Sequence, residues 1–540
     1  MTHTPRWLAL PAVPVLLTLA ACSTTSSSAD PATGGSAAIT VGTTDKVAAL
    51  DPAGEFDAGS GKVASEVYAH LLASPAGSTE LKPDLAASAE FEDPTTYKVV
   101  LKKGLTFANG DALTASDVKF SFDRQQKIAD PNGPSSLLYN LASTEAVDDT
   151  TVLFRLKSAN DQVFPQVVAS AAGTVVDEQV FSPTAITPDA TILAKKPFAG
   201  PYTIAGYKAN ELVTFTANDA YQGIYGTPAT STVNLQYFAD ASNLKLELQN
   251  GDVDVAYRTL TTTDVDSLAK DDDLAVHTGA ATGIRFLTFN VGTQPFGTKT
   301  KDADPAKALA VRQAIADLID RDAISEDVYK GTFTPLYSYV PEGLTGANES
   351  LKGLYGDGNG APDADQAAQR LEAAGVETPL DISIQYVSER YGPSSSDEYA
   401  IIKENLEESG LFTVNLQSTE WVQYSKDRVA DLYPAYQLGW FPDYSDADNY
   451  LTPFFLTENF LANHYDNPEV NDLVLEQAVT ADEAARTALI EEIQDKVAAD
   501  LSTIPYMQGA QVAVVGTDVQ GAEDTLDASF KFRYAALSKG

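Results

Sequence analysis

Two charged side chains, Asp443 and Arg390, stand where an α/β chain could use them to hold a small charged molecule. Arg390 follows an alternating apolar segment that ends at Tyr386, and Asp443 follows a second predicted strand, which ends at Gly439. A carboxylate can pair with an ammonium group, and a guanidinium can hold a carboxylate through two parallel hydrogen bonds. The alternative for Asp443 is a solvated loop carboxylate, and for Arg390 it is a surface ion pair.

The elements that must position these two residues are predicted in the C-terminal half of the chain. In order, the pattern predicts a strand over 380–386, a helix over 396–409, a strand starting at 414, a helix over 424–430 and a strand over 435–439. Strand-helix-strand order predicts right-handed crossovers and a parallel sheet. Because ligands bind at the carboxyl edge of such sheets, we expect Arg390 and Asp443 at that edge.

Residues for the common enzyme chemistries are scarce. A serine hydrolase needs a Gly-x-Ser-x-Gly elbow and a histidine beside the nucleophile, but that motif is missing, and the histidines beyond the N-terminal segment are His70, His277 and His464. The segment 59–62 lacks the earlier glycine of a phosphate-binding loop, and Val63 replaces its Ser or Thr. Paired glycosidase carboxylates stay open, since there are 75 acidic residues. The sequence favours a binding protein over an enzyme.

We predict no cofactor and no metal-ligating residue. Asp443, Asp446 and Asp448 lie close together, but their spacing is not that of an EF-hand, so a solvated acidic loop is the simpler interpretation. Four histidines and one cysteine are too few to favour direct coordination of a transition metal. A metal that arrives already chelated stays open as a ligand.

Charge and length restrict the class of protein. Lys and Arg number 36 against 75 Asp and Glu, so the formal charge is -39. Such a surface repels nucleic acid and anionic lipid headgroups, and we expect no nucleic-acid partner. A chain of 540 residues exceeds what one hydrophobic core usually serves, so at least two lobes are expected.

The N-terminus has the features of an exported lipoprotein. Arg6 precedes an apolar run over 7–19 that is too short to span a membrane, which indicates a signal peptide over residues 1–21. Cys22 is the only cysteine, and the preceding Leu-Ala-Ala resembles a lipobox; a secreted protein with an incidental cysteine is the alternative. Residues 22–36 are small and polar and predict a flexible tether. We expect an extracytoplasmic protein anchored by lipid on Cys22 to the outer face of the cell membrane.

The first half of the chain predicts further elements. Lys62 to Leu72 predicts a helix, and in the segment LTFANGDALTASDVKFSFDR, from Leu105 to Arg124, Thr114 and Asp117 stand at capping-box spacing. The other expected elements are strands starting at 39, over 97–101 and over 152–156, two strands within 200–223, a helix and a short strand within 244–257, and a helix over 304–319.

Segments spread over nearly the whole chain resemble one bacterial family, the extracytoplasmic solute-binding proteins of family 5, which serve peptide- and nickel-type ABC importers. The segments are LTFANGDALTASDVKFSFDR, GPYTIAGYKANELVTFTANDAYQG, LQNGDVDVAY, VRQAIADLIDRDAI, LGWFPDYSDADNYLTPFF and IPYMQGAQVAVVGTDVQG. The resemblance implies an α/β, two-lobed fold of the periplasmic-binding-protein type II kind, with a hinge and an additional subdomain in the first lobe. It assigns 37–73, 197–287 and 501–540 to the first lobe, 74–196 to the additional subdomain and 288–500 to the second lobe.

The resemblance also implies roles for single residues. In dipeptide- and oligopeptide-binding relatives, the aspartate matching Asp443 holds the ligand's α-ammonium group, and in dipeptide binders an arginine near the position of Arg390 takes the α-carboxylate. Trp440 and Trp421 match positions whose indoles line the side-chain pocket, although Trp421 could equally be a core residue. With two neighbours added by adjacency, the candidate ligand-binding residues are Asp443, Arg390, Trp440, Trp421, Tyr391 and Tyr444.

The function implied by the resemblance is non-enzymatic. A monomeric lipoprotein would capture short peptides in a cleft between the lobes and deliver them to the permease subunits of an ABC importer, which work with a cytoplasmic ATPase. Closure of the two lobes around the ligand would be the signal that the importer reads. Two alternatives stay open: a binding protein for oligosaccharide or a chelated metal in the same fold, and a surface receptor lipoprotein without an importer.

Overall fold

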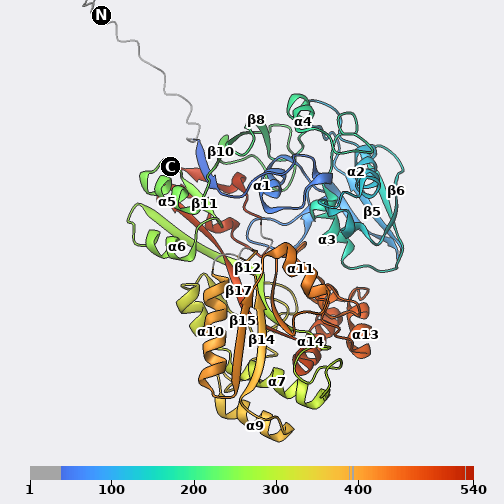
Figure 1. Cartoon of the computed structure of the whole chain (residues 1–540). Helices are drawn as coiled ribbons and strands as arrows, with labels where there is room; N and C mark the ends of the chain where they lie inside the picture. Colours follow the sequence, from blue (N-terminus) through green and yellow to red (C-terminus); the bar gives the residue numbers. More distant parts are fainter. Residues whose placement is uncertain (1–37, 388–389, 392–393, 529–530) are drawn as a thin grey trace, which may run out of the picture. The chain divides into compact units, whose positions relative to one another are not determined.

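The computed structural model describes residues 38–387, 390–391, 394–528 and 531–540 (Figure 1). The predicted signal peptide (1–21), the lipidation at Cys22 and the predicted tether (22–36) lie outside the described residues. Those that are described belong to one compact unit. Within them, no helix has the length and apolar character needed to cross a membrane.

One mixed sheet of eleven strands runs through the unit. Its strands are β1 (Ile39–Thr43), β8 (Tyr202–Lys208), β9 (Leu212–Ala217), β10 (Thr232–Tyr237), β11 (Val255–Tyr257), β12 (Leu274–Phe289), β13 (Phe333–Pro335), β14 (Leu380–Tyr386), β15 (Phe412–Ser418), β16 (Ala435–Trp440) and β17 (Thr503–Gly516). They follow the order β15-β14-β16-β12-β17-β11-β1-β10-β9-β8, and β13 pairs with β17 outside that path. Strands from both halves of the sequence therefore share one sheet.

Two long antiparallel strands, β12 and β17, occupy the middle of this sheet. On one side of this strand pair, β17 pairs with β11. On the other side, β12 pairs with β16 through Ile284 to Phe289. The register of β12 against β17 shifts between Ala280 and Ile284. Figure 1 shows the two strands passing from the part beside β11 to the part beside β14 and β15. The two ends of the sheet are thus joined by continuous β-structure.

The strand-helix series predicted for the second half of the chain is confirmed. β14 pairs in parallel with β15, and through Ile384 and Gln385 it pairs in parallel with β16. The helices α10 (Ser395–Glu408) and α11 (Trp421–Val429) connect these strands in sequence. Because β14 and β16 are parallel neighbours, the segments that follow them leave the sheet at the same edge.

A second, antiparallel sheet of four strands packs with α2 (Ala115–Ile128) around its own apolar core. Its strands are β4 (Ala86–Asp93), β5 (Thr96–Leu101), β6 (Leu141–Ala146) and β7 (Thr151–Leu156), paired in the order β4-β5-β7-β6. The predicted capping box begins α2, since the Asp117 carboxylate accepts the Thr114 backbone N–H at 2.8 Å. The prediction for this segment is therefore confirmed.

Arg124, near the end of α2, holds that helix to the chain segment around Asp51. Its guanidinium pairs with the Asp51 carboxylate through two hydrogen bonds, and its Nε donates to the Ser182 carbonyl at 2.6 Å. The two charged side chains are only 2% and 0% exposed. Asp51 also accepts the backbone N–H groups of Ala53 and Thr187. The pair is therefore buried and hydrogen-bonded on both sides, as a buried ion pair must be to persist.

The helix predicted over Lys62 to Leu72 is wrong at both ends. α1 spans Ala58–Val67, and Tyr68, which follows it, has an extended backbone. The helix begins early because Asp57 caps it by accepting two backbone N–H groups of the first turn at 3.0 and 2.9 Å. Gly59 and Gly61 make this helix start difficult to predict from the sequence, since glycine is a weak helix former. Gly59 cannot be larger, because an added Cβ would lie 2.0 Å from the Lys46 carbonyl oxygen.

The remaining elements surround the two sheets. They are α3 (Phe164–Val168), α4 (Asp189–Lys195), α5 (Ala241–Asn250), α6 (Thr262–Leu268), α7 (Pro305–Leu318), α8 (Arg321–Ala323), α9 (Ala364–Ala374), α12 (Asp448–Phe455), α13 (Pro468–Gln477), α14 (Glu483–Asp500), β2 (Leu72–Ala73), β3 (Lys82–Pro83), β18 (Val519–Gln520) and β19 (Ser538–Lys539). One apolar core joins β14, β15 and β16 to α7, α10 and α14, and another joins β1 and β8 to β10 with α1. Separate cores agree with the expectation of more than one lobe; the lobe boundaries stay a prediction.

Candidate functional site

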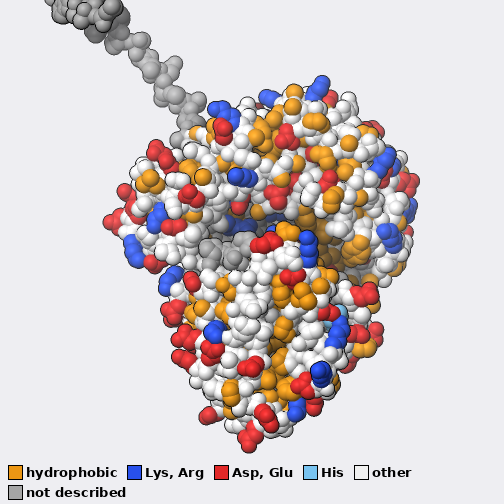
Figure 2. Space-filling model, in the orientation of Figure 1, with side chains coloured by type: hydrophobic (Ala, Val, Ile, Leu, Met, Phe, Trp, Pro, Cys, Tyr) orange, Lys and Arg blue, Asp and Glu red, His pale blue; other side chains and the backbone are white. Residues whose placement is uncertain are grey.

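A cavity of about 610 Å³ lies at the carboxyl edge of β14 and β16. Its walls come from the start of α1, the end of α3, the end of β11, the loops after β14 and β16, and the C-terminal segment 531–534. Figure 2 shows the surface hollowed across the middle of the face in view. All six residues proposed from the sequence line this cavity: Asp443, Arg390, Trp440, Trp421, Tyr391 and Tyr444.

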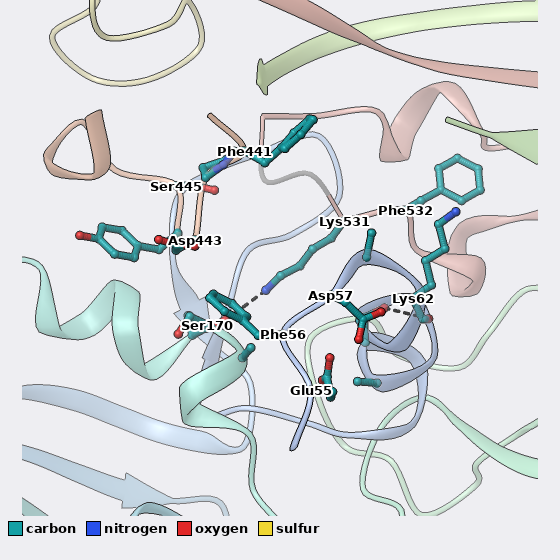
Figure 3. A pocket seen from close by; sticks show the side chains of 18 of the residues that line it. Glu55, Phe56, Asp57, Lys62, Ser170, Phe441, Asp443, Ser445, Lys531 and Phe532 are labelled. Carbon is teal, nitrogen blue, oxygen red and sulfur yellow. Dashed lines mark hydrogen bonds between the residues drawn. The ribbon is translucent and has the colours of Figure 1, made fainter. Parts of the chain in front are cut away.

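Asp443 presents a partly buried carboxylate to the cavity (Figure 3). It lies in the loop after β16, and its side chain receives one long hydrogen bond, 3.4 Å, from Asn449 Nδ2. Among the described residues, no cationic group lies within 4.0 Å of this carboxylate. Burial raises the pKa of Asp443 to about 6. An ionised Asp443 therefore has no counter-charge among the described residues, and a cationic group in the cavity would supply one.

Asn449, at the start of α12, positions two of the candidate residues at once. Its Oδ1 accepts hydrogen bonds from Trp440 Nε1 and from the Asp443 backbone N–H, each at 2.9 Å. The Trp440 indole also packs edge-on against Phe454 and Phe460, with ring centroids 5.1 and 5.4 Å apart. Asn449 is itself buried, so these positions are tightly determined. Nothing in the sequence pattern distinguishes it from the polar residues around it.

The other carboxylates of this loop have protein partners, so the interpretation of the segment as a solvated acidic loop is wrong for them. Asp446 accepts two hydrogen bonds from Arg486, at 2.9 and 2.7 Å. Asp448 is buried and accepts hydrogen bonds from Gln477 and Tyr444, at 2.5 and 3.0 Å. The Tyr444 ring packs against the core of the four-stranded sheet. The described residues contain no group of three or more His, Cys, Asp or Glu side chains placed to hold a metal.

Arg390, Trp421 and Tyr391 form another side of the cavity. The guanidinium carbon of Arg390 lies 5.0 Å from the Trp421 ring centroid, and the Tyr391 ring meets the same indole edge-on at 6.1 Å. Arg390 is exposed, and no described carboxylate lies within ion-pair distance of it. Gly439 makes room for this arrangement, since an added Cβ would lie 3.0 Å from Tyr391 Cε1 and 2.9 Å from Arg285 Nη1.

The cavity also contains residues that the sequence did not single out as ligand contacts, among them Glu55, Lys62, Arg258, Phe441 and Lys531. Figure 3 shows four of these side chains around the same space. Burial raises the pKa of Glu55 to about 8, which leaves it mainly protonated at neutral pH, and burial lowers the pKa of Lys531 to about 8. No local spacing marks these residues, because only folding brings their distant segments together.

Residues 80–461 match the bacterial extracellular solute-binding proteins, family 5 (middle region), a match that spans more than half of the chain. The chain belongs to solute-binding family 5. The resemblance drawn from the sequence motifs is confirmed, and the family's extracellular location agrees with the expected extracytoplasmic one.

Individual members of solute-binding family 5 match most of the chain. Heme-binding protein A of Haemophilus influenzae is 25% identical over 482 residues, which cover 84% of each chain. Di/tripeptide-binding protein 1 of Pseudomonas aeruginosa is 25% identical over 471 residues, 82% of each chain. The crystal structure of the ABC transporter substrate-binding protein CtaP of Listeria monocytogenes aligns with a TM-score of 0.78 at 23% identity, covering 94% of this chain and 100% of that one.

These likenesses confirm the predicted fold class, an α/β periplasmic-binding-protein fold of more than one domain. They also confirm the class of activity. Family 5 proteins bind solutes and do not catalyse reactions on them, so the chain is a binding protein and not an enzyme. The cavity at the sheet edge is its candidate ligand site.

Proposed function

We propose that the chain captures short peptides in this cavity for an ABC importer. The observation that carries the proposal is Asp443: a partly buried carboxylate that faces the cavity and has no described cation within 4.0 Å. A peptide's α-ammonium group would supply that cation, and charge-assisted hydrogen bonds are the strong ones in a partly dry site. The similarity to a di/tripeptide-binding protein of Pseudomonas aeruginosa supports the same class of ligand.

Other candidate residues complete the proposed peptide site. Arg390 would hold the α-carboxylate through two parallel hydrogen bonds, which suits a guanidinium that has no described carboxylate partner. The half-buried indoles of Trp440 and Trp421 offer apolar faces to ligand side chains. Tyr391 and Tyr444 would close the walls beside them.

The proposal includes the route of the ligand. A lipid on Cys22 and a tether over 22–36 would hold the folded part near the outer face of the membrane, where permease subunits could receive the peptide. The lobe assignment inferred from the family resemblance belongs to the same proposal: closure would move residues 288–500 against the first lobe, with β12 and β17 as the continuous strands between them.

Native mass spectrometry of the gently purified mature protein tests the ligand class. We expect a series of masses that fit di- to tetrapeptides, and calorimetry should then show that an added alanine tripeptide displaces them. An oligosaccharide mass or a chelated metal would contradict the peptide proposal. Peptide binding without any defect in peptide uptake by cells that lack the protein would instead favour a surface receptor.

Peptide affinity should fall in acid because of Asp443. Its pKa in the unliganded protein is raised to about 6, and only the ionised form can pair with an ammonium group. The interaction is therefore present above about pH 6 and is lost as the pH falls through that value. Between pH 7 and pH 5 we expect about tenfold weaker binding of an alanine tripeptide, whose terminal groups keep their charges over most of that range. Calorimetry at pH 5, 6 and 7 checks this, and a flat profile would exclude Asp443 as the ammonium partner.

A further inference from the structure

The charge of the cavity wall is opposite to that of the protein. The whole chain has 36 Lys and Arg against 75 Asp and Glu. The cavity is lined by four cationic side chains, Lys62, Arg258, Arg390 and Lys531, and by three carboxyl groups, Glu55, Asp57 and Asp443. One of those carboxyl groups, Glu55, is mainly protonated at neutral pH, since its pKa is about 8. Cationic charge therefore exceeds anionic charge in the one cavity described above, which predicts an anionic component in the ligand.

Two of these cations already have partners in the protein. Lys62 Nζ donates to the Asp45 carboxylate at 2.8 Å and to Thr43 Oγ1 at 3.0 Å. The Arg258 guanidinium packs against the rings of Tyr257 and Phe441, at 5.9 and 5.6 Å from their centroids. Lys62 is therefore paired with a carboxylate outside the cavity lining, while Arg258 lies at one end of the cavity beside two aromatic rings. Without Lys62, the cations Arg258, Arg390 and Lys531 still outnumber the carboxylates Asp57 and Asp443 in the lining.

Lys531 differs from them. Its ammonium group donates to the Ala169 carbonyl oxygen at 3.1 Å, at the C-terminal end of α3, and this is its one hydrogen bond to the described residues. No described carboxylate lies within 4.0 Å of it. In the view of Figure 3 its side chain extends into the space between Asp443 and Asp57. An ammonium group has three N–H donors, so two of them have no acceptor among the described residues and could serve a ligand.

The charged groups around Lys531 do not neutralise it. Burial, and then repulsion by Arg533, lower the pKa of Lys531, while Asp527 and Asp84 attract its charge from beyond ion-pair distance. Asp527 is engaged by Arg533 at 2.9 Å, and Asp84 accepts hydrogen bonds from Tyr221 and Ile224. Both carboxylates are therefore committed to other donors. Among the described residues, no carboxylate lies close enough to pair with Lys531, so an acidic group in the cavity could take that place.

We infer that the preferred ligand is an acidic peptide, one with a side-chain carboxylate in addition to its terminal carboxylate, and that Lys531 holds this second acidic group. The inference rests on the proposed peptide function and specifies its ligand. The three charges of such a peptide then have separate partners: Asp443 for the ammonium group, Arg390 for the terminal carboxylate and Lys531 for the side chain. A lysine suits the third role, because its compact charge accepts a carboxylate from several directions.

The test compares tripeptides that differ only in charge. Calorimetry would measure Ala-Glu-Ala and Ala-Ala-Glu against Ala-Gln-Ala and Ala-Ala-Gln, each on the wild-type protein, on Lys531→Met and on Lys531→Arg. We expect the wild type to prefer at least one glutamate peptide over its glutamine partner by tenfold or more. Lys531→Met should reduce that preference to less than threefold, whatever its effect on the affinity for the glutamine peptides. Lys531→Arg keeps the charge and should retain most of the preference.

Each result has a distinct meaning. Equal affinity of the wild type for the glutamate and glutamine peptides would overturn the inference and leave the peptide function intact. A preference that survives in Lys531→Met would also overturn it, since the acidic group would then bind elsewhere. No binding of any of the four tripeptides, together with no peptide in the native mass spectrum, would contradict the proposed function itself. Because the wild-type comparison needs no variant, it decides the matter even where a substitution impairs folding.

Discussion

Replacing Asp443 by asparagine should weaken the binding of an alanine tripeptide by roughly 30-fold to several thousand-fold, the equivalent of about 2 to 5 kcal/mol. The substitution keeps the shape and the ability to accept the 3.4 Å hydrogen bond from Asn449, but it removes the charge. The peptide ammonium group would then be desolvated without an ionised partner, which is the costly state. Isothermal titration calorimetry at pH 7.5, where the wild-type carboxylate is ionised, measures the difference.

The control for this result is a peptide with an acetylated N-terminus. That peptide has no ammonium group, so Asp443→Asn should change its affinity by less than threefold, and the cycle of two proteins and two peptides isolates the proposed pair. The unliganded variant should melt at the same temperature as the wild type or higher, because burial disfavours the wild-type charge. Equal losses for both peptides would mean that the substitution acts through the loop and not through the amine.

Replacing Arg124 by methionine should lower the free energy of unfolding by about 3 to 5 kcal/mol. The substitution leaves the Asp51 carboxylate buried, at 0% exposed, without its guanidinium partner. It also leaves the Ser182 carbonyl without the Nε donor. Urea denaturation monitored by tryptophan fluorescence, together with thermal melting, measures the decrease in the free energy of unfolding.

Lys119→Met on the same helix is the matched control. Lys119 pairs with Asp123 across one helical turn, but both side chains are 44% exposed, and such surface pairs contribute about 1 kcal/mol or less. The two variants remove one positive charge each from α2 and differ mainly in burial. Similar losses in both would show that the Arg124 pair does not hold the helix in place. The double variant Arg124→Met/Asp51→Asn should recover part of the loss, since it removes the uncompensated charge.

The elements around the site could be predicted because their signals are local. Apolar residues alternate along β14 up to Tyr386, and α10, which follows that strand, has an apolar face of its own. The capping box of α2 likewise lies within four consecutive residues. The start of α1 was missed because Gly59 is placed by a close contact with Lys46, a packing requirement that opposes helix propensity.

The cavity residues from the rest of the chain could not be found in this way. Arg258 follows a three-residue strand and Lys531 lies near the C-terminus, and neither belongs to a recognisable motif. They meet the loop after β16 only because β11 and β16 flank the same two long strands. In the acidic loop after β16, closeness in sequence is misleading. Asp446 lies close to Asp443 in sequence, yet its hydrogen bonds with Arg486 give it a structural role.

The double role of Asn449 has a consequence for how ligand preference can change. One amide oxygen fixes both the Trp440 indole and the Asp443 backbone. A mutation that reshapes the apolar pocket by moving that indole will therefore disturb the charged end of the site as well. No hydrogen bond among the described residues joins Lys531 to this oxygen. Selection for a new preference among ligand side chains, in evolution or in the laboratory, should therefore accumulate substitutions around Lys531. It should spare Trp440 and the residues that hold it.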